Sequence, residues 1–404
     1  MKLYFKDQTF SFELLRAASY ASYGGAEIGE CLATAARIRQ GDFESWHVEW
    51  LRAAERVDTL ATRALGEGHQ ISAREAFLRA SNYYRTAEFF LAPEDPRRLV
   101  TYGRSRETFR ESVKLMGTPV EMIRIPYEGT VLPGYLYTVD DSGARRPTII
   151  AVGGFDSTGE ELYFFTAAAA LRRGYNCIAF DGPGQGEPLR FHQMPARPDY
   201  EIPVRAVVDF AVARPEVDPA RLAIWGISMG GYYAPRAAAF EPRLKACVVH
   251  GAMYDLWDAQ ASKQPLLFML AKRWPGLLNH DAIFNVKARF DPGLRWASAN
   301  GMWVFGAHTR RELLTAIRDY SLKGVASRIT CPTLIMHGEG DHFMPPQQAT
   351  VLYAALKCPK TLRMFNADEG AEEHCQVGNL SLMHQVAFDW LDDAFDLAGR
   401  YRST

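Results

Sequence analysis

Residues 222–231 read Leu-Ala-Ile-Trp-Gly-Ile-Ser-Met-Gly-Gly, and this stretch decides the fold. Its first four residues form an apolar run typical of a strand buried on both faces of a parallel sheet, and residues 232–240 are compatible with a helix. Ser228 stands between Gly226 and Gly230, where glycines allow the sharp turn that lifts a serine hydroxyl clear of a sheet. In this strand–turn–helix context the sequence predicts that Ser228 is a catalytic nucleophile rather than part of a glycine-rich turn.

A serine nucleophile needs a base that takes its proton and an acid that orients the base. On a strand–turn–helix scaffold the three follow in the order serine, acid, histidine, each on a loop after a strand. Asp341 follows the predicted strand 333–336, and His374 follows the predicted strand 361–365. The sequence therefore predicts a triad of Ser228, His374 and Asp341.

Other histidines and acids near these strands leave alternatives open. His337 and His342 compete with His374 as the base, although His337 is expected to end its strand and His342 adjoins the acid too closely to face it across a site. Asp255, shortly after the strand that ends at His250, is the alternative acid. His250 is a candidate for lining the pocket.

Backbone N–H groups near Ser228 are expected to stabilise the negative charge that develops on a substrate carbonyl. One donor should be Met229, the residue after the nucleophile. The second should come from the loop after the strand 149–152, where Gly153 and Gly154 allow a close approach of the backbone. We predict that Phe155 supplies this second N–H.

The sequence pattern changes near residue 118. Residues 1–118 repeat apolar side chains every three or four positions, which predicts an N-terminal helical domain. Residues 119–404 alternate short apolar runs with helical segments, which predicts an α/β catalytic domain with a mostly parallel sheet. The alternation stops between about residues 255 and 320, where we expect a helical cap insertion.

Composition excludes several classes of protein. The formal net charge of the 404 residues is −1, without a long run of one sign, which argues against a partner nucleic acid. No segment is apolar over about 18 residues, so we expect no membrane span, and the N-terminus lacks the apolar stretch of a signal peptide. Six cysteines are scattered without C-x-x-C pairs, which favours reduced thiols in a cytoplasmic protein.

Two motifs resemble binding sites without matching them. Residues 181–187 read Asp-Gly-Pro-Gly-Gln-Gly-Glu after a strand, but the spacing differs from the G-x-G-x-x-G of dinucleotide-binding loops. His337 and His342 flank Asp341 without forming H-E-x-x-H or another closed ligand set. We therefore expect neither a cofactor nor a metal ion.

Taken together, these motifs resemble the α/β-hydrolases, and in particular the branch that includes 2,6-dihydroxypseudooxynicotine hydrolase and the fungal pigment hydrolases that shorten polyketide chains. The similar strings are residues 41–50, 79–90, 153–158, 181–186 and 226–231. The resemblance implies an α/β-hydrolase fold with a helical N-terminal region, and it places Ser228, Asp341 and His374 on the family's triad positions. It also implies cleavage of a carbon–carbon bond next to a ketone. An additional acidic residue helps to bind substrate in the nicotine-pathway relative, and Asp255, Asp258 and Glu160 are the candidates for it here.

The sequence thus predicts a serine hydrolase that acts on a small-molecule carbonyl compound, by cleaving either an ester or a carbon–carbon bond of a β-diketone or polyketide-like molecule. An acyltransferase or a lactone-forming cyclase would use the same triad. A non-catalytic binding protein on this fold is a third hypothesis, but such proteins normally lose a triad member.

The helical segments are expected to close a pocket over Ser228. Its aromatic and acidic lining is predicted to include Tyr83, Tyr84, Glu160, Tyr163, Trp257, Asp258, Phe268 and Trp303. Apolar faces on the N-terminal helices are candidates for a homodimer contact.

Overall fold

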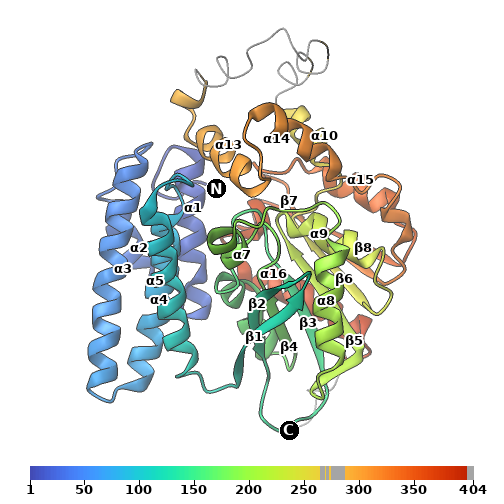
Figure 1. The fold of residues 1–404 in the computed structure, drawn as a ribbon, viewed down its shortest axis with the longest axis horizontal. Helices are drawn as coiled ribbons and strands as arrows, with labels where there is room; N and C mark the ends of the chain where they lie inside the picture. The colour runs from blue at the N-terminus through green and yellow to red at the C-terminus, as the bar shows by residue number, and fades with distance from the viewer. Residues whose placement is uncertain (264–268, 270–272, 274–286, 398–404) are drawn as a thin grey trace.

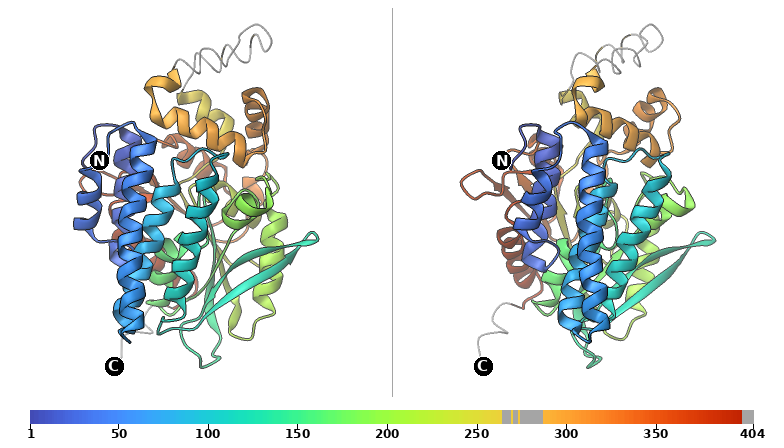
Figure 2. Two further views of the ribbon diagram at one scale, coloured as in Figure 1. Left: turned by 60° about the vertical axis from the view of Figure 1, so that its left-hand side comes forward. Right: turned by 90° about the vertical axis from the view of Figure 1, so that its left-hand side faces the viewer.

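The N-terminal part of the protein is helical, as its periodicity predicts. The computed structural model describes residues 1–263, 269, 273 and 287–397, so Phe268 lies outside the described residues. The N-terminal elements are α1 (Gln8–Ser19), η1 (Tyr20–Tyr23), α2 (Ile28–Ala35), α3 (Phe43–Gly66), α4 (Gln70–Glu88) and α5 (Pro96–Val113). They stand beside the sheet in both Figure 1 and Figure 2.

These helices share a core of their own. Trp46 and Trp50 of α3 are fully buried, and they pack with Tyr83 of α4 and Phe90 just after it. Asp42 begins α3 by accepting a hydrogen bond from the backbone N–H of Ser45, as expected of an aspartate at a helix N-terminus. Among the described helices, none combines the length and apolar character that crossing a membrane requires.

A sheet of eight strands follows, and the predicted, mostly parallel arrangement is confirmed. The strands are β1 (Val120–Tyr127), β2 (Thr130–Tyr137), β3 (Arg146–Val152), β4 (Asn176–Phe180), β5 (Val217–Ile227), β6 (Ala246–His250), β7 (Thr333–Gly338) and β8 (Lys360–Phe365). Their order is β1-β2-β4-β3-β5-β6-β7-β8. The pairs β1–β2 and β2–β4 are antiparallel, whereas β3 to β8 run parallel.

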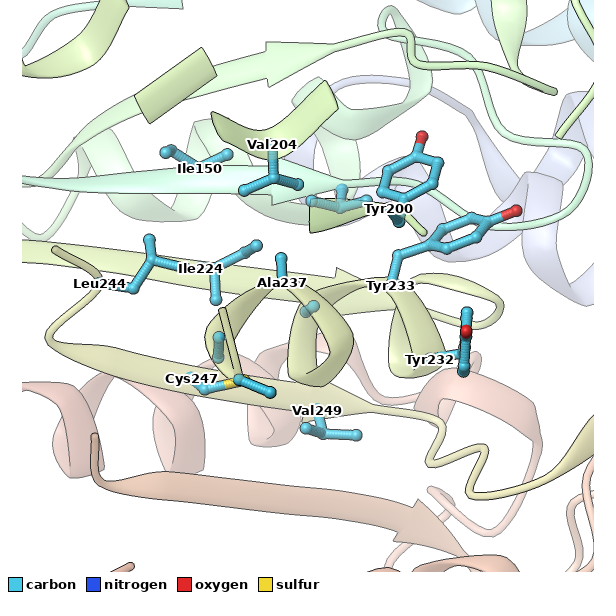
Figure 3. Packing of buried hydrophobic residues seen from close by; sticks show 14 of the residues in the cluster. Ile150, Tyr200, Val204, Ile224, Tyr232, Tyr233, Ala237, Leu244, Cys247 and Val249 are labelled. Carbon is cyan, nitrogen blue, oxygen red and sulfur yellow. The ribbon is translucent and has the colours of Figure 1, made fainter. Parts of the chain in front are cut away.

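Both faces of the central strands are buried, which explains why they read as continuous apolar runs. On β3, Ile150 and Val152 point into the core under α8 (Glu201–Val212) and α9 (Gly230–Ala238), which Figure 3 shows around Val204 and Tyr233. Their neighbours Ile149 and Ala151 point into the core under α16 (Leu380–Ala394) on the other face.

The remaining helices of the described residues lie between strands, except η5, which follows β8. They are η2 (Tyr163–Ala167), α6 (Ala168–Leu171), α7 (Gly186–His192), α10 (Leu256–Lys263), α13 (Pro292–Val304), α14 (Arg310–Ala316), η3 (Ile317–Asp319), η4 (Ala326–Arg328), α15 (Gln347–Ala355) and η5 (His374–Gln376). Between β6 and β7, the described residues form helices without a further strand of the sheet, in line with the predicted loss of alternation. In Figure 1, α10, α13 and α14 lie above the sheet, and α13 lies next to the upper end of α1.

Candidate active site

Ser228 occupies a strained turn between β5 and α9. Its φ angle is +58°, in the left-handed region that non-glycine residues avoid, and its N–H donates to the carbonyl oxygen of His250, 2.8 Å away. Gly226 and Gly230 do not supply this conformation, since neither has a positive φ. They supply space instead: a Cβ on Gly226 would overlap the carbonyl oxygen of Gly230, and a Cβ on Gly230 would overlap that of Val152.

His374 comes from the loop after β8 and faces the serine. Its Nε2 lies 2.8 Å from Oγ of Ser228, and its Nδ1 lies 2.6 Å from Oδ2 of Asp341. Burial alone would lower the pKa of His374, but the adjacent Asp341 carboxylate and, to a smaller extent, Cys375 together raise it by more, so that the pKa lies well above its usual range. The structure thus brings the three residues of the predicted triad together, with His374 between Ser228 and Asp341 as predicted.

Asp341 is held by its own backbone turn after β7. Its Oδ1 accepts hydrogen bonds from the N–H groups of Phe343 and Met344, both at 2.8 Å. Burial raises the pKa of this carboxyl, but His374 and these hydrogen bonds lower it to about 2. Asp341 is therefore an ionised carboxylate at neutral pH, with one oxygen free to orient His374.

The competing residues have other roles. His337 ends β7, and its two ring nitrogens contact backbone groups of Ala252 and Met344 at 3.1 Å. His342 contacts Glu373 on the far side of the acid, with Nδ1 3.2 Å from Oε2. Asp255 accepts a hydrogen bond from the N–H of residue 258 at the start of α10, which is the bond of a helix cap.

The loop after β3 runs close to the serine. A Cβ on Gly154 would lie 2.8 Å from Cβ of Ser228, so only glycine permits this approach. Within the described residues, no acceptor is found for the N–H of Phe155 or for the N–H of Met229. Two backbone donors next to Ser228 are therefore available, and the assignment of Phe155 and Met229 to an oxyanion hole stays a prediction.

A cavity of about 270 Å³ opens in front of Ser228 and His374. Its described lining is mainly apolar, with side chains from the N-terminal helices, from the loop after β3 and from the helices between β6 and β7. The apolar members include Phe12, Phe155, Phe165, Met253, Leu294, Trp296, Phe305 and Leu313. Four charged residues, Glu13, Arg16, Asp156 and Glu161, form one cluster in the same wall. Neither this cluster nor Trp296 belongs to the predicted lining.

The comparison with known proteins places this geometry in a family. Residues 143–367 match the family model described as serine aminopeptidase, S33. The chain belongs to the α/β-hydrolase family. Hydrolase LUC6 of Fusarium sp is 39% identical over 414 residues, which cover 97% of this hydrolase and 98% of the relative. The 20-hydroxy-prefusarin hydrolase FUS2 of Gibberella moniliformis is 38% identical over 412 residues, which cover 97% of each chain.

A solved structure shares the fold of this hydrolase over most of its length. The structure of 2,6-dihydroxy-pseudo-oxynicotine hydrolase matches with a TM-score of 0.75 and 24% identity, covering 93% of this hydrolase and 95% of that chain. The predicted α/β-hydrolase fold and the predicted family resemblance are confirmed.

Two of the predicted pocket residues lie instead in the core of the N-terminal helices. Tyr83 and Tyr84 of α4 are at most 1% exposed, and their hydroxyl groups donate to Glu30 and Asp58 at 2.8 and 3.0 Å. The periodicity of an amphipathic helix does not distinguish a side chain facing a neighbouring helix from one facing a ligand.

Glu160 and Tyr163 also lie outside the cavity lining of this hydrolase. The Glu160 carboxylate accepts a hydrogen bond from the hydroxyl of Tyr135 at 2.7 Å, and the ring of Tyr163 packs on that of Tyr137. It is the neighbour in sequence, Glu161, that faces the cavity.

Trp257, Asp258 and Trp303 are turned away from the cavity as well. The ring of Trp303 lies beneath the guanidinium group of Arg98, 4.3 Å from its centroid, and Trp257 likewise stacks under Arg318. Asp258 is exposed on α10 and is paired with Lys323. The cavity of this hydrolase is thus lined by other residues than the aromatic ones that the sequence predicted.

Proposed function

We propose that this hydrolase cleaves a carbonyl compound through an acyl-enzyme formed on Ser228, with His374 as general base and Asp341 as its orienting acid. The observation that carries the proposal is the relay of two short contacts, 2.8 Å from serine to histidine and 2.6 Å from histidine to aspartate, at the wall of an apolar cavity. Groups at these distances can pass a proton without rearrangement.

In the first half of the reaction, Oγ of Ser228 attacks the substrate carbonyl carbon while its proton moves to Nε2 of His374. Asp341 holds the imidazole and stabilises its positive charge. The N–H groups of Phe155 and Met229 hold the oxyanion. The tetrahedral adduct then collapses, and His374 returns the proton to the leaving group, which is an alkoxide oxygen or the carbon of an enolate.

In the second half, water attacks the acyl group on Ser228 and loses a proton to His374. Collapse of the second adduct returns that proton to Oγ and releases a carboxylic acid. The net change is the addition of one water molecule across the cleaved bond.

The proposed substrate is a mainly apolar, polyketide-like molecule that carries this carbonyl group. The apolar lining of the cavity supports such a molecule. So do the names of two similar proteins, which refer to 20-hydroxy-prefusarin and 2,6-dihydroxy-pseudo-oxynicotine, both small organic compounds. The bond is the ester bond or the carbon–carbon bond of a β-diketone.

A panel of aryl esters set beside a panel of β-diketones tests the proposal. Cleavage of either class by the wild-type enzyme, together with fluorophosphonate labelling of Ser228, is the expected result. If the enzyme cleaves esters but no β-diketone, carbon–carbon bond cleavage is excluded as its activity. Transfer of the acyl group to an added alcohol in preference to water would identify an acyltransferase, and an unlabelled Ser228 would overturn the mechanism.

A further inference from the structure

The charged cluster in the cavity wall is unusual because it is largely buried beside a mainly apolar lining, whose other charged members are Lys263 and Arg310. Glu13 and Arg16 come from α1, whereas Asp156 and Glu161 come from the segment after β3. Burying charges costs free energy unless each is paired, so the pairing within the cluster determines which group is left for a ligand.

Arg16 is fully occupied by two of the three carboxylates. Its Nε and Nη2 lie 2.8 and 2.7 Å from the two oxygens of Glu161, and its Nη1 lies 2.8 Å from Oδ2 of Asp156. Arg85 adds a second positive charge 3.5 Å from Glu161. Glu13 receives only a long contact of 3.4 Å from Nη1 of Arg16 to its Oε2. Within the described residues, no hydrogen bond is found for its Oε1.

When Arg85 is counted with the four residues of the cluster, three carboxylates lie beside two guanidinium groups. Glu13 is the least compensated of the three, and only 1% of its surface is exposed. Burial raises the pKa of Glu13 to about 7, with Asp156 and Glu161 adding to the rise and Arg16 and Arg85 opposing it. In contrast, Arg16 and Arg85 outweigh the burial of Glu161 and lower its pKa to about 2. A carboxyl group that keeps its proton below pH 7 is a hydrogen-bond donor.

We propose that Glu13 is a specificity-determining residue, whose protonated carboxyl group donates a hydrogen bond to a second, neutral carbonyl oxygen of the substrate, other than the one that Ser228 attacks. The inference rests on the proposed function, because the substrate must fill this cavity to reach Ser228. The cluster is electrically balanced when Glu13 is neutral, so a ketone or amide oxygen fits it. A carboxylate does not fit next to Glu13, because Arg16 is already occupied and Asp156 would repel it.

Three p-nitrophenyl esters test this preference. Their acyl chains are of equal length and end in a methyl ketone, in an isopropyl group of the same shape, or in a carboxylate. We expect wild-type kcat/KM at about pH 6 to be about tenfold higher for the ketone than for the isopropyl ester, the usual value of a hydrogen bond in a buried site, and lowest for the carboxylate. The ketone preference should shrink as the pH rises through 7, because ionised Glu13 can no longer donate.

Two variants separate the hydrogen bond from the structural role of the side chain. In Glu13→Leu the ketone preference should disappear. In Glu13→Gln it should persist and lose its pH dependence, since the amide donates at every pH. Glu27→Gln makes the same chemical change at an exposed position next to α2 and should keep the wild-type profile. Equal rates for the ketone and isopropyl esters in the wild type, or an unchanged pH dependence in Glu13→Gln, would overturn the proposal.

Binding without turnover distinguishes this inference from the proposed function. Amide analogues of the ketone and isopropyl esters are titrated calorimetrically into Ser228→Ala, with and without Glu13→Gln. Tighter binding of the ketone analogue below pH 7 supports the role of Glu13 even if no ester is hydrolysed, whereas equal binding overturns it. If a fluorophosphonate does not label Ser228 of the wild-type enzyme but the ketone analogue still binds more tightly than the isopropyl analogue, only the proposed function is overturned.

Discussion

Arg16 and Glu161 form a bidentate ion pair in the interior of the protein, with N–O distances of 2.8 and 2.7 Å, although 145 residues separate them in the chain. The pair joins α1 to the segment after β3, which also carries Phe155, the predicted oxyanion donor. The N-terminal helices are thereby fixed against the part of the chain that surrounds Ser228. A hydrolase built in this way depends on its N-terminal region for the shape of its pocket.

Replacing Arg16 with methionine should destabilise the protein strongly. The substitution keeps most of the side-chain volume but leaves the buried Glu161 and the half-buried Asp156 without their main partner, and we expect a loss of about 3–5 kcal/mol in the free energy of unfolding. Urea unfolding measures this loss. Arg97→Met removes an exposed pair with Glu44 and should cost about 1 kcal/mol or less. Equal losses of unfolding free energy in the two variants would show that the buried pair does not stabilise the protein more than the exposed pair.

The sequence predicted the order of strands and helices and the loops that carry Ser228, Asp341 and His374, because those features depend on local patterns. Ser228 directly follows a buried, apolar strand, and Asp341 and His374 lie in the loops after two further strands. The contacts between the three residues follow from the parallel direction of β5, β7 and β8, which brings the loops after them to one edge of the sheet.

The pocket lining could not be predicted in the same way, because it depends on how helices distant in sequence pack together. Tyr84 and Trp303 are both aromatic residues in helical segments. The hydroxyl of Tyr84 donates to Asp58 and the ring of Trp303 stacks on Arg98, and neither side chain belongs to the cavity lining. One signal for the missed residues is present in α1. That helix is apolar on most sides, yet it carries Glu13 and Arg16 three residues apart. Charges in a helix buried on all sides must meet partners or a ligand.

Replacing Ser228 with alanine should lower turnover by at least about 10⁴-fold, because the nucleophile is lost while the cavity and oxyanion donors remain. The measurement is kcat for an aryl ester.

Comparison of Ser228→Ala with Ser228→Gly isolates the strain of the turn. Both variants lack the hydroxyl, but glycine adopts a φ of +58° without steric cost, so Ser228→Gly should be more stable than Ser228→Ala by about 1 kcal/mol. Equal stabilities would mean that the turn carries no strain.

Replacing Gly226 with alanine should destabilise the protein by about 3 kcal/mol, because the added Cβ would overlap the backbone of Gly230 and neither segment can move without disturbing the sheet. Gly103 offers a matched control. It lies in the middle of α5, where an added Cβ meets no atom within 4 Å, and Gly103→Ala should stabilise the protein by about 0.5–1 kcal/mol through helix propensity. Thermal unfolding compares the two, and a neutral Gly226→Ala would contradict the close approach.

The pH dependence of hydrolysis tests the pairing of His374 with Asp341. His374 must be neutral to accept the serine proton, and its pKa is raised because Asp341, together with Cys375, stabilises the charged imidazolium more than burial destabilises it. The rate therefore falls about tenfold for each pH unit below this pKa and levels off above it, so the acid limb of kcat/KM should lie above pH 6.5, the ordinary value for histidine. In Asp341→Asn the carboxylate is gone and burial remains, so the acid limb should move to lower pH while kcat/KM falls on the order of 10⁴-fold.

The control is Asp255→Asn, which changes the competing acid at the start of α10. It keeps a residue type suited to a helix cap and should leave the acid limb in place. If Asp255→Asn shifts the limb and Asp341→Asn does not, the acid of the triad has been assigned to the wrong loop.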